Sequence, residues 1–177
     1  AKAGGNFASN EAIDVAADEV DQLKNRMSVP PTDDTHKYVW DSNGKGEPLP
    51  STLRGILNSK KTFLDACGAE DGLCGLVVEA TPFYAEAGGQ VADLGTITTA
   101  DGGVFQVSDV KKVGPYVIHV GKATSGKLSL ADAVTLSVDY ARRAPIAKNH
   151  TTTHMLNFAL KGALGQACEQ VRTSLLP

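Results

Sequence analysis

The chain has 177 residues, enough for one domain of ordinary size or a small domain with attached pieces. Hydrophobic residues make up 42% and charged residues 21%, as in a soluble globular protein, and no apolar run is long enough to span a bilayer. The net charge of −3 excludes a broadly basic surface, so any binding of RNA must use a local patch of Lys or Arg. We therefore expect neither DNA binding nor membrane contact.

The three cysteines are odd in number and unevenly spaced, at Cys67, Cys74 and Cys168. They form no Cys-x-x-Cys pair, so neither a disulfide framework nor a metal knuckle is predicted. A reducing, cytoplasmic location fits this usage. A mitochondrial or other organellar form stays open, because a transit peptide would lie outside the sequence.

The first predicted element is a helix over residues 9–27, where apolar side chains recur at helical spacing. Ser9 or Asn10 can cap it, and the prolines at residues 30–31 stop it. We expect this helix to pack on a neighbouring domain. Residues 32–50 have the composition of a linker, with residues 38–40 as a short strand or an anchor.

Short β-branched segments follow, at residues 73–80, 104–110, 115–120 and 134–140. Turn residues separate them, and we expect residues 51–66 to add a short strand and a turn. Several short strands at this spacing indicate a small antiparallel barrel.

A helix is predicted from His150, with Asn149 as its N-cap and Gly165 at its end. His150 and His154 lie four residues apart, so both imidazoles share one face and can reach one metal ion, for which zinc is suited. The apolar side chains from Leu156 onward lie away from them. Two surface polar residues remain the simpler alternative. No Glu follows His150, which argues against the His-Glu-x-x-His metalloproteases.

Two segments resemble the editing region of alanyl-tRNA synthetases. Residues 83–95 match Phe-Tyr-x-Glu-x-Gly-Gly-Gln-x-x-Asp-x-Gly, and an Arg-Arg pair at 142–143 precedes Asn-His-x-x-Thr-His-Met-Leu at 149–156. Free-standing alanyl-tRNA editing proteins share both segments. Residues 31–38 look like the linker of eukaryotic-type synthetases, which favours a synthetase. The resemblance covers about residues 10–170.

The resemblance implies an α+β fold. A small antiparallel β-barrel of the translation-protein type would be flanked by an N-terminal helix and the first helix of an editing core. The corresponding parts are residues 1–50 for helix and linker, 51–142 for the barrel, and 143–177 for the start of the metal-binding core.

The same resemblance implies roles for individual residues. His150 and His154 would bind zinc, and Thr153 and Gln170 would line the amino-acid pocket. Alternatively, Thr153 bonds to its own helix backbone and Gln170 is simply exposed. No residue stands out as a general base.

The glycines Gly88 and Gly89 would form part of the pocket wall. The tripeptide that they make with Gln90 also occurs in release factors, but three residues are too few to support that function. Arg142, Arg143 and Lys148 would contact phosphates of the tRNA acceptor end, or they form a solvated connector.

The sequence also departs from the family pattern. The family's Cys-x-x-x-His zinc ligands have no counterpart here, and Cys168 is interpreted as an ordinary thiol. ATP and Mg²⁺ would bind only in a missing aminoacylation domain. We therefore expect part of an alanine–tRNA ligase, from the region that hydrolyses mischarged Ser- or Gly-tRNA(Ala), incomplete for catalysis alone. The alternative is a non-catalytic tRNA-binding or assembly module.

Overall fold

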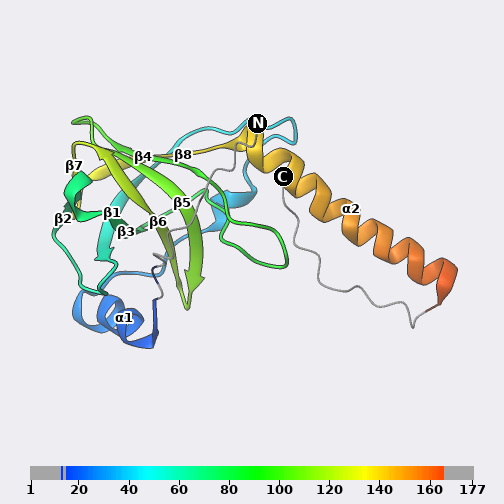
Figure 1. Cartoon of the computed structure of the whole chain (residues 1–177), viewed down its shortest axis with the longest axis horizontal. Helices are drawn as coiled ribbons and strands as arrows, with labels where there is room; N and C mark the ends of the chain where they lie inside the picture. Colours follow the sequence, from blue (N-terminus) through cyan, green and yellow to red (C-terminus); the bar gives the residue numbers. More distant parts are fainter. Residues whose placement is uncertain (1–12, 14, 166–177) are drawn as a thin grey trace, which may run out of the picture.

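The computed structural model describes residue 13 and residues 15–165, and its centre is a closed antiparallel barrel (Figure 1). Neighbouring strands follow the order β1-β3-β6-β5-β4-β8, and β8 closes on β1. This confirms the predicted α+β fold with a small barrel. The strands are β1 (Leu49–Asn58), β3 (Leu73–Val78), β4 (Gly95–Thr99), β5 (Val104–Val113), β6 (Tyr116–Ser125) and β8 (Ala133–Val138).

A separate two-stranded sheet pairs β2 (Ala66–Gly68) with β7 (Lys127–Ser129). The 3₁₀ helix η3 (Ala69–Asp71) follows β2 and leads into β3. Cys67 on β2 and Cys74 on β3 are buried free thiols, in agreement with the prediction of no disulfide for these two residues. Cys168 lies outside the described residues.

The barrel interior is filled by apolar side chains that alternate along the strands. On β5, Phe105 and Val107 point inward, and a register shift between Val107 and Asp109 then brings Val110 inward. Such a bulge adds one residue and changes which face the following side chains occupy. β3 is buried at all six positions, because one face lines the barrel and the other is covered from outside.

The N-terminal segment covers the outer face of β3. The helix predicted for this segment is only partly correct. Ile13 and Val15 lie outside any helix, and the helical part comprises α1 (Ala17–Asp21) and the π-helical turn η1 (Gln22–Arg26). The Ala16 amide donates to the Glu19 carboxylate at 2.7 Å, which fixes the start at Ala17. Ile13 and Leu23 pack on the chain's own barrel.

The linker contains the 3₁₀ helix η2 (Thr35–Tyr38) and no strand at residues 38–40. Of the two predicted alternatives, the anchor is confirmed. The Trp40 ring stacks on Tyr140, with 6.3 Å between centroids and 21° between planes.

The last element, α2 (Tyr140–Leu164), begins ten residues before the predicted start. Its N-cap is Asp139, whose carboxylate accepts from the Arg142 amide at 3.0 Å, and Asn149 lies well inside the helix. Pro145 lies inside the helix, where proline removes one backbone hydrogen bond, and burial of Tyr140, Ala144 and Ile146 stabilises the turn around it. Gly165 ends the helix at φ +91°, as predicted.

Beyond residue 150, α2 extends away from the barrel (Figure 1). Its large apolar side chains there are exposed, with Phe158 at 82% and Leu164 at 70%. Across the described residues, no helix combines the length and the apolar character that a membrane span requires.

Candidate functional site

The segment that joins β3 to β4 lies against α2, so the two family-like sequence segments meet in space. At its tip, Ala87 and Gln90 exchange backbone hydrogen bonds around Gly88 and Gly89, whose φ angles are +60° and +85°. Positive φ at both central residues favours glycine. A Cβ atom on Gly88 would lie 3.6 Å from His150 Cε1, so the turn sits directly beside the imidazole.

Gln90 contacts the first histidine of the pair. Its side-chain oxygen lies 3.1 Å from His150 Nδ1, and Gln90 is only 6% exposed. An amide oxygen can only accept, so the neutral form of the ring that fits this contact carries its proton on Nδ1. This is the tautomer that leaves Nε2 able to bind a metal ion or a substrate proton.

The second histidine stands one helical turn further out. The rings of His150 and His154 are 4.8 Å apart between centroids and tilted by 37°. In the part of the chain that the structure describes, no third His, Cys, Asp or Glu joins them to form a group that could hold a metal ion. The pair thus offers two nitrogen ligands, which fits part of a zinc site.

Arg143 holds α2 to the same loop from inside. Its Nε lies 3.0 Å from Asp93 Oδ2, and both side chains are at most 3% exposed. The guanidinium also donates to the carbonyl oxygens of Pro82 and Lys37. Asp93 in turn accepts from the Tyr84 amide at 2.6 Å. Arg143 therefore fixes the position of the helix, and its buried guanidinium has no surface to offer an RNA phosphate.

The other two basic residues have different surroundings. Arg142 is half-buried and donates to the Ala92 carbonyl at 2.9 Å, while Lys148 is exposed on α2. The predicted basic cluster is thus divided among the interior, a loop carbonyl and solvent. Lys148 is the member best placed to meet a phosphate.

The predicted pocket residues are described only in part. Thr153 is half-buried on the face of His150 and His154, and its hydroxyl donates to the Asn149 carbonyl at 2.9 Å. The oxygen can still accept a hydrogen bond. Gln170 lies outside the described residues.

A buried histidine supports the start of the loop. His119 on β6 is fully buried, with Nε2 2.7 Å from Thr81 Oγ1 and Nδ1 3.1 Å from the Leu76 carbonyl. Thr81 Oγ1 also accepts from the Phe83 amide. Burial lowers the pKa of His119 to about 4, so the ring is neutral at pH 7.

Residues 8–142 match the family model for class II (A) tRNA synthetases. The chain is 41% identical to the cytoplasmic alanine–tRNA ligase of Dictyostelium discoideum, over 84% of the chain and 15% of that protein. The chain belongs to the alanyl-tRNA synthetase family. The resemblance of the sequence segments is thereby confirmed at the level of family.

Other members of the family give a consistent picture. The mitochondrial alanine–tRNA ligase of Saccharomyces cerevisiae is 36% identical over 99% of the chain, and the Candida albicans enzyme is 34% identical over 93%. The chain spans only 15–17% of the length of these relatives.

Within this alanyl-tRNA synthetase region, the sequence prediction missed two contacts. Gln90 was treated only as part of a glycine turn, and Asp93 was quoted in a motif but given no role. A signal for Asp93 is its charge, because a carboxylate within a segment rich in apolar residues and glycine needs a cationic partner if it is buried. No comparable signal pairs Gln90 with His150, since an uncharged amide can face water or almost any polar partner.

Proposed function

We propose that this chain is the barrel and first editing helix of an alanine–tRNA ligase, which attaches alanine to tRNA(Ala) using ATP. The loop at residues 83–95 and α2 would form one wall of the site that hydrolyses Ser- or Gly-tRNA(Ala). The observation that supports this most is the Gln90–His150 contact beside the His150–His154 pair. It gives the two separate sequence segments one shared location and fixes one imidazole.

The need for a second site follows from the size of the substrates. One methylene or one hydroxyl gives too little binding energy to exclude a near-isostere from an apolar pocket, so a separate hydrolytic site raises fidelity. Thr153 would favour serine at that site by accepting a hydrogen bond from the serine hydroxyl. Gln170 is proposed for the same pocket on the family pattern.

Zinc is the metal that we propose for His150 and His154. Two imidazoles on successive turns suit it, and the proton on His150 Nδ1 leaves Nε2 as the ligand atom. The remaining ligands would lie beyond the described residues. When bound, zinc would polarise the ester or position a water. Gly88 suits this wall because of its φ of +60°, since a Cβ atom there would make only an ordinary contact with the His150 ring.

The partners follow from the same proposal. The acceptor end of tRNA(Ala) would approach α2, with Lys148 and the outer side of Arg142 toward its phosphates. The rest of the synthetase would contact α2 and supply the site for ATP and Mg²⁺. We propose a cytoplasmic location, with a mitochondrial form as the alternative, since relatives of both kinds match.

A second function is favoured by one observation. The described residues contain no group of three metal-binding side chains, which suits a tRNA-binding or assembly module without catalysis. In that case, Gln90 and His150 would serve only to join α2 to the barrel.

Deacylation of Ser-tRNA(Ala) distinguishes the editing function from the non-catalytic module. The purified 177-residue chain and a full-length ligase carrying it would be assayed with His150→Ala, His154→Ala and a chelator. We expect turnover by the full-length enzyme that both substitutions and chelation abolish. A full-length enzyme whose editing is unaffected by both substitutions would refute the editing proposal and favour the binding module.

A further inference from the structure

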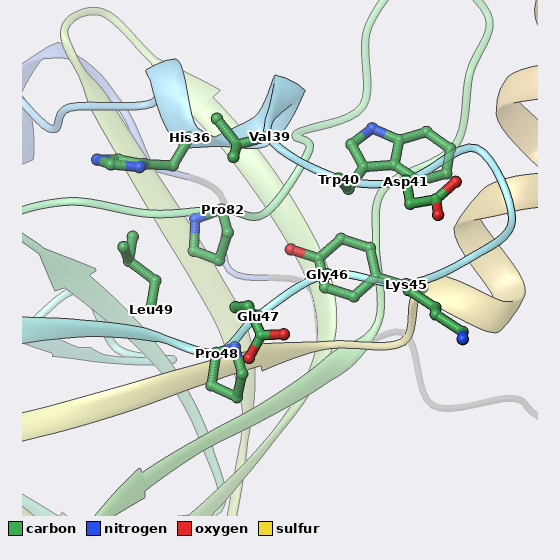
Figure 2. Close-up of a pocket in the computed structure, with 11 residues that line it drawn as sticks. His36, Val39, Trp40, Asp41, Lys45, Gly46, Glu47, Pro48, Leu49 and Pro82 are labelled. Atoms are coloured by element: carbon green, nitrogen blue, oxygen red, sulfur yellow. The ribbon is translucent and has the colours of Figure 1, made fainter.

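A cavity of about 540 Å³ lies between the linker and the start of α2 (Figure 2). Figure 2 shows its lining along two stretches of chain, with Pro82 between them: His36 with residues 39–41, and residues 45–49 at the start of β1. Its walls are mainly apolar or aromatic, and its size is in the range of small-molecule sites. Trp40, Glu47 and Tyr140 supply its aromatic faces and polar groups.

Tyr140 contributes a buried polar atom with no partner. The residue is 7% exposed, and its hydroxyl is the one buried side-chain polar atom of the described residues that forms no hydrogen bond. Gly46 covers the ring so closely that a Cβ atom there would lie 2.3 Å from Tyr140 Cζ. Leaving a buried hydroxyl unpaired is costly, so a ligand atom that reaches it when the Gly46 segment shifts recovers this penalty.

Trp40 separates this cavity from a second hollow of about 470 Å³, which is lined by Lys148, Thr151 and Thr152 of α2. The indole is held in place from one side. Arg143 lies 5.7 Å from its centroid and 4.8 Å from that of Tyr140, and Asp93 fixes the guanidinium. An aromatic ring that is already held in place can stack on a ligand with little loss of conformational entropy.

We propose that this cavity binds an unpaired nucleobase of RNA. Trp40 stacks on the base, Tyr140 and the exposed carboxylate of Glu47 bond to its edge, and Lys148 meets a phosphate on the far side of Trp40. A carboxylate accepts from the exocyclic amino group of cytosine or adenine, and uracil has none. The proposal rests on the proposed function only in naming RNA as the source of the base.

Trp40 is the only tryptophan of the chain, so its fluorescence reports on this site alone. The full chain would be titrated with CMP, AMP, UMP and ribose 5-phosphate. We expect saturable quenching by CMP and AMP with midpoints on the order of a millimolar, as one stacked base allows. UMP should bind more weakly, and ribose 5-phosphate should give no saturable change.

Two variants test the edge contacts. Tyr140→Phe keeps the ring and should weaken CMP binding by about threefold to tenfold, the loss expected for one hydrogen bond. Glu47→Gln should remove the preference for CMP over UMP. Tyr84→Phe is the matched control, because that hydroxyl bonds to the Ala87 carbonyl outside the cavity, and it should leave all four titrations unchanged.

Thermal unfolding supplies a readout without ligand. Since the Tyr140 hydroxyl has no partner among residues 15–165, Tyr140→Phe should unfold at the same or a higher temperature. A lower unfolding temperature would overturn the claim that this hydroxyl is free to bond to a ligand.

Equal quenching by ribose 5-phosphate and CMP, or no quenching by any of them, would overturn the nucleobase site. So would unchanged CMP affinity in Tyr140→Phe. The editing proposal and the nucleobase site can be refuted independently. Nucleotide binding with no deacylation by the full-length enzyme would refute only the editing proposal. Deacylation without nucleotide binding refutes this site alone.

Discussion

The two halves of α2 differ in what holds them. Up to Ile146, the helix is packed on the barrel and tied to the 83–95 loop by the buried Arg143–Asp93 pair. Beyond His150, it extends from the barrel and exposes Phe158 and Leu164. The inner half owes its conformation to tertiary contacts, and the outer half depends on its own helical propensity. His150 lies at the junction, where it contacts Gln90 of that loop, and His154 follows one turn beyond it.

Breaking the inner half should have the largest effect. Asp93→Ala leaves the Arg143 guanidinium buried without its carboxylate, which typically costs about 3–5 kcal/mol. We expect the midpoint of urea unfolding to fall accordingly, followed by circular dichroism. An Asp93→Ala chain that unfolds like the parent would mean that the pair does not hold α2 to the loop.

Acidic pH should lower the free energy of unfolding through His119, which is buried in the barrel. The pKa of this buried ring is about 4, while in the unfolded chain it is near 6.5. Below pH 6.5 the unfolded chain gains a proton that the folded one does not, so stability falls as the pH drops from 6.5 to 4, by roughly 3 kcal/mol.

The measurement is urea unfolding between pH 7.5 and 4 for the parent chain and for His119→Gln. The carboxylates of the chain titrate in both, so only the difference reports on His119. We expect the parent to lose more stability over this range than the variant. Parallel curves would contradict a neutral, buried His119.

Gln90→Ala tests the contact with His150, which lies where the inner and outer halves of α2 meet. Loss of this neutral hydrogen bond should cost about 1 kcal/mol of stability. Nitrogen-15 NMR of the imidazoles should show His150 changing from the Nδ1–H tautomer to a mixture, while His154 stays the same. A His150 spectrum that does not change would show that Gln90 does not set the tautomer.

The smallest effect is expected in the outer half. Phe158→Gln replaces a side chain that is 82% exposed and should change the free energy of unfolding by no more than about 0.5 kcal/mol. A loss of several kcal/mol would mean that this side chain is buried in solution, and the contrast between the two halves would disappear.

The barrel could be predicted because most of its strands are β-branched segments that lie between turn residues. β4 was missed, since Gly95–Thr99 is short and its Thr residues are typical of turns as well as strands. The start of α2 was misplaced because Pro145 hides a helix whose inner turns are stabilised by distant partners. Asp93 lies 50 residues from Arg143 in the chain, so only the fold brings the two together, whereas Tyr140 is a neighbour of Arg143 one helical turn away.

The candidate site was predicted unevenly for the same reason. The spacing of His150 and His154 fixes a shared face, and the structure shows their rings side by side. Burial of Arg143 could not be predicted from the sequence, because a run of basic residues next to a helix usually faces solvent. The role of Gln90 depends on a contact across 60 residues, which only the fold brings together.

The most direct test compares two glutamine substitutions in a full-length ligase carrying this chain. Gln90 contacts His150, whereas Gln106 is exposed on β5 and bonds to the Gly95 carbonyl. We predict that Gln90→Ala lowers Ser-tRNA(Ala) deacylation by about tenfold or more and leaves alanine attachment intact, as expected when a ligand histidine loses its orienting partner. Gln106→Ala should change neither rate. Full deacylation by Gln90→Ala would contradict the claim that this loop and α2 form one wall of the editing site.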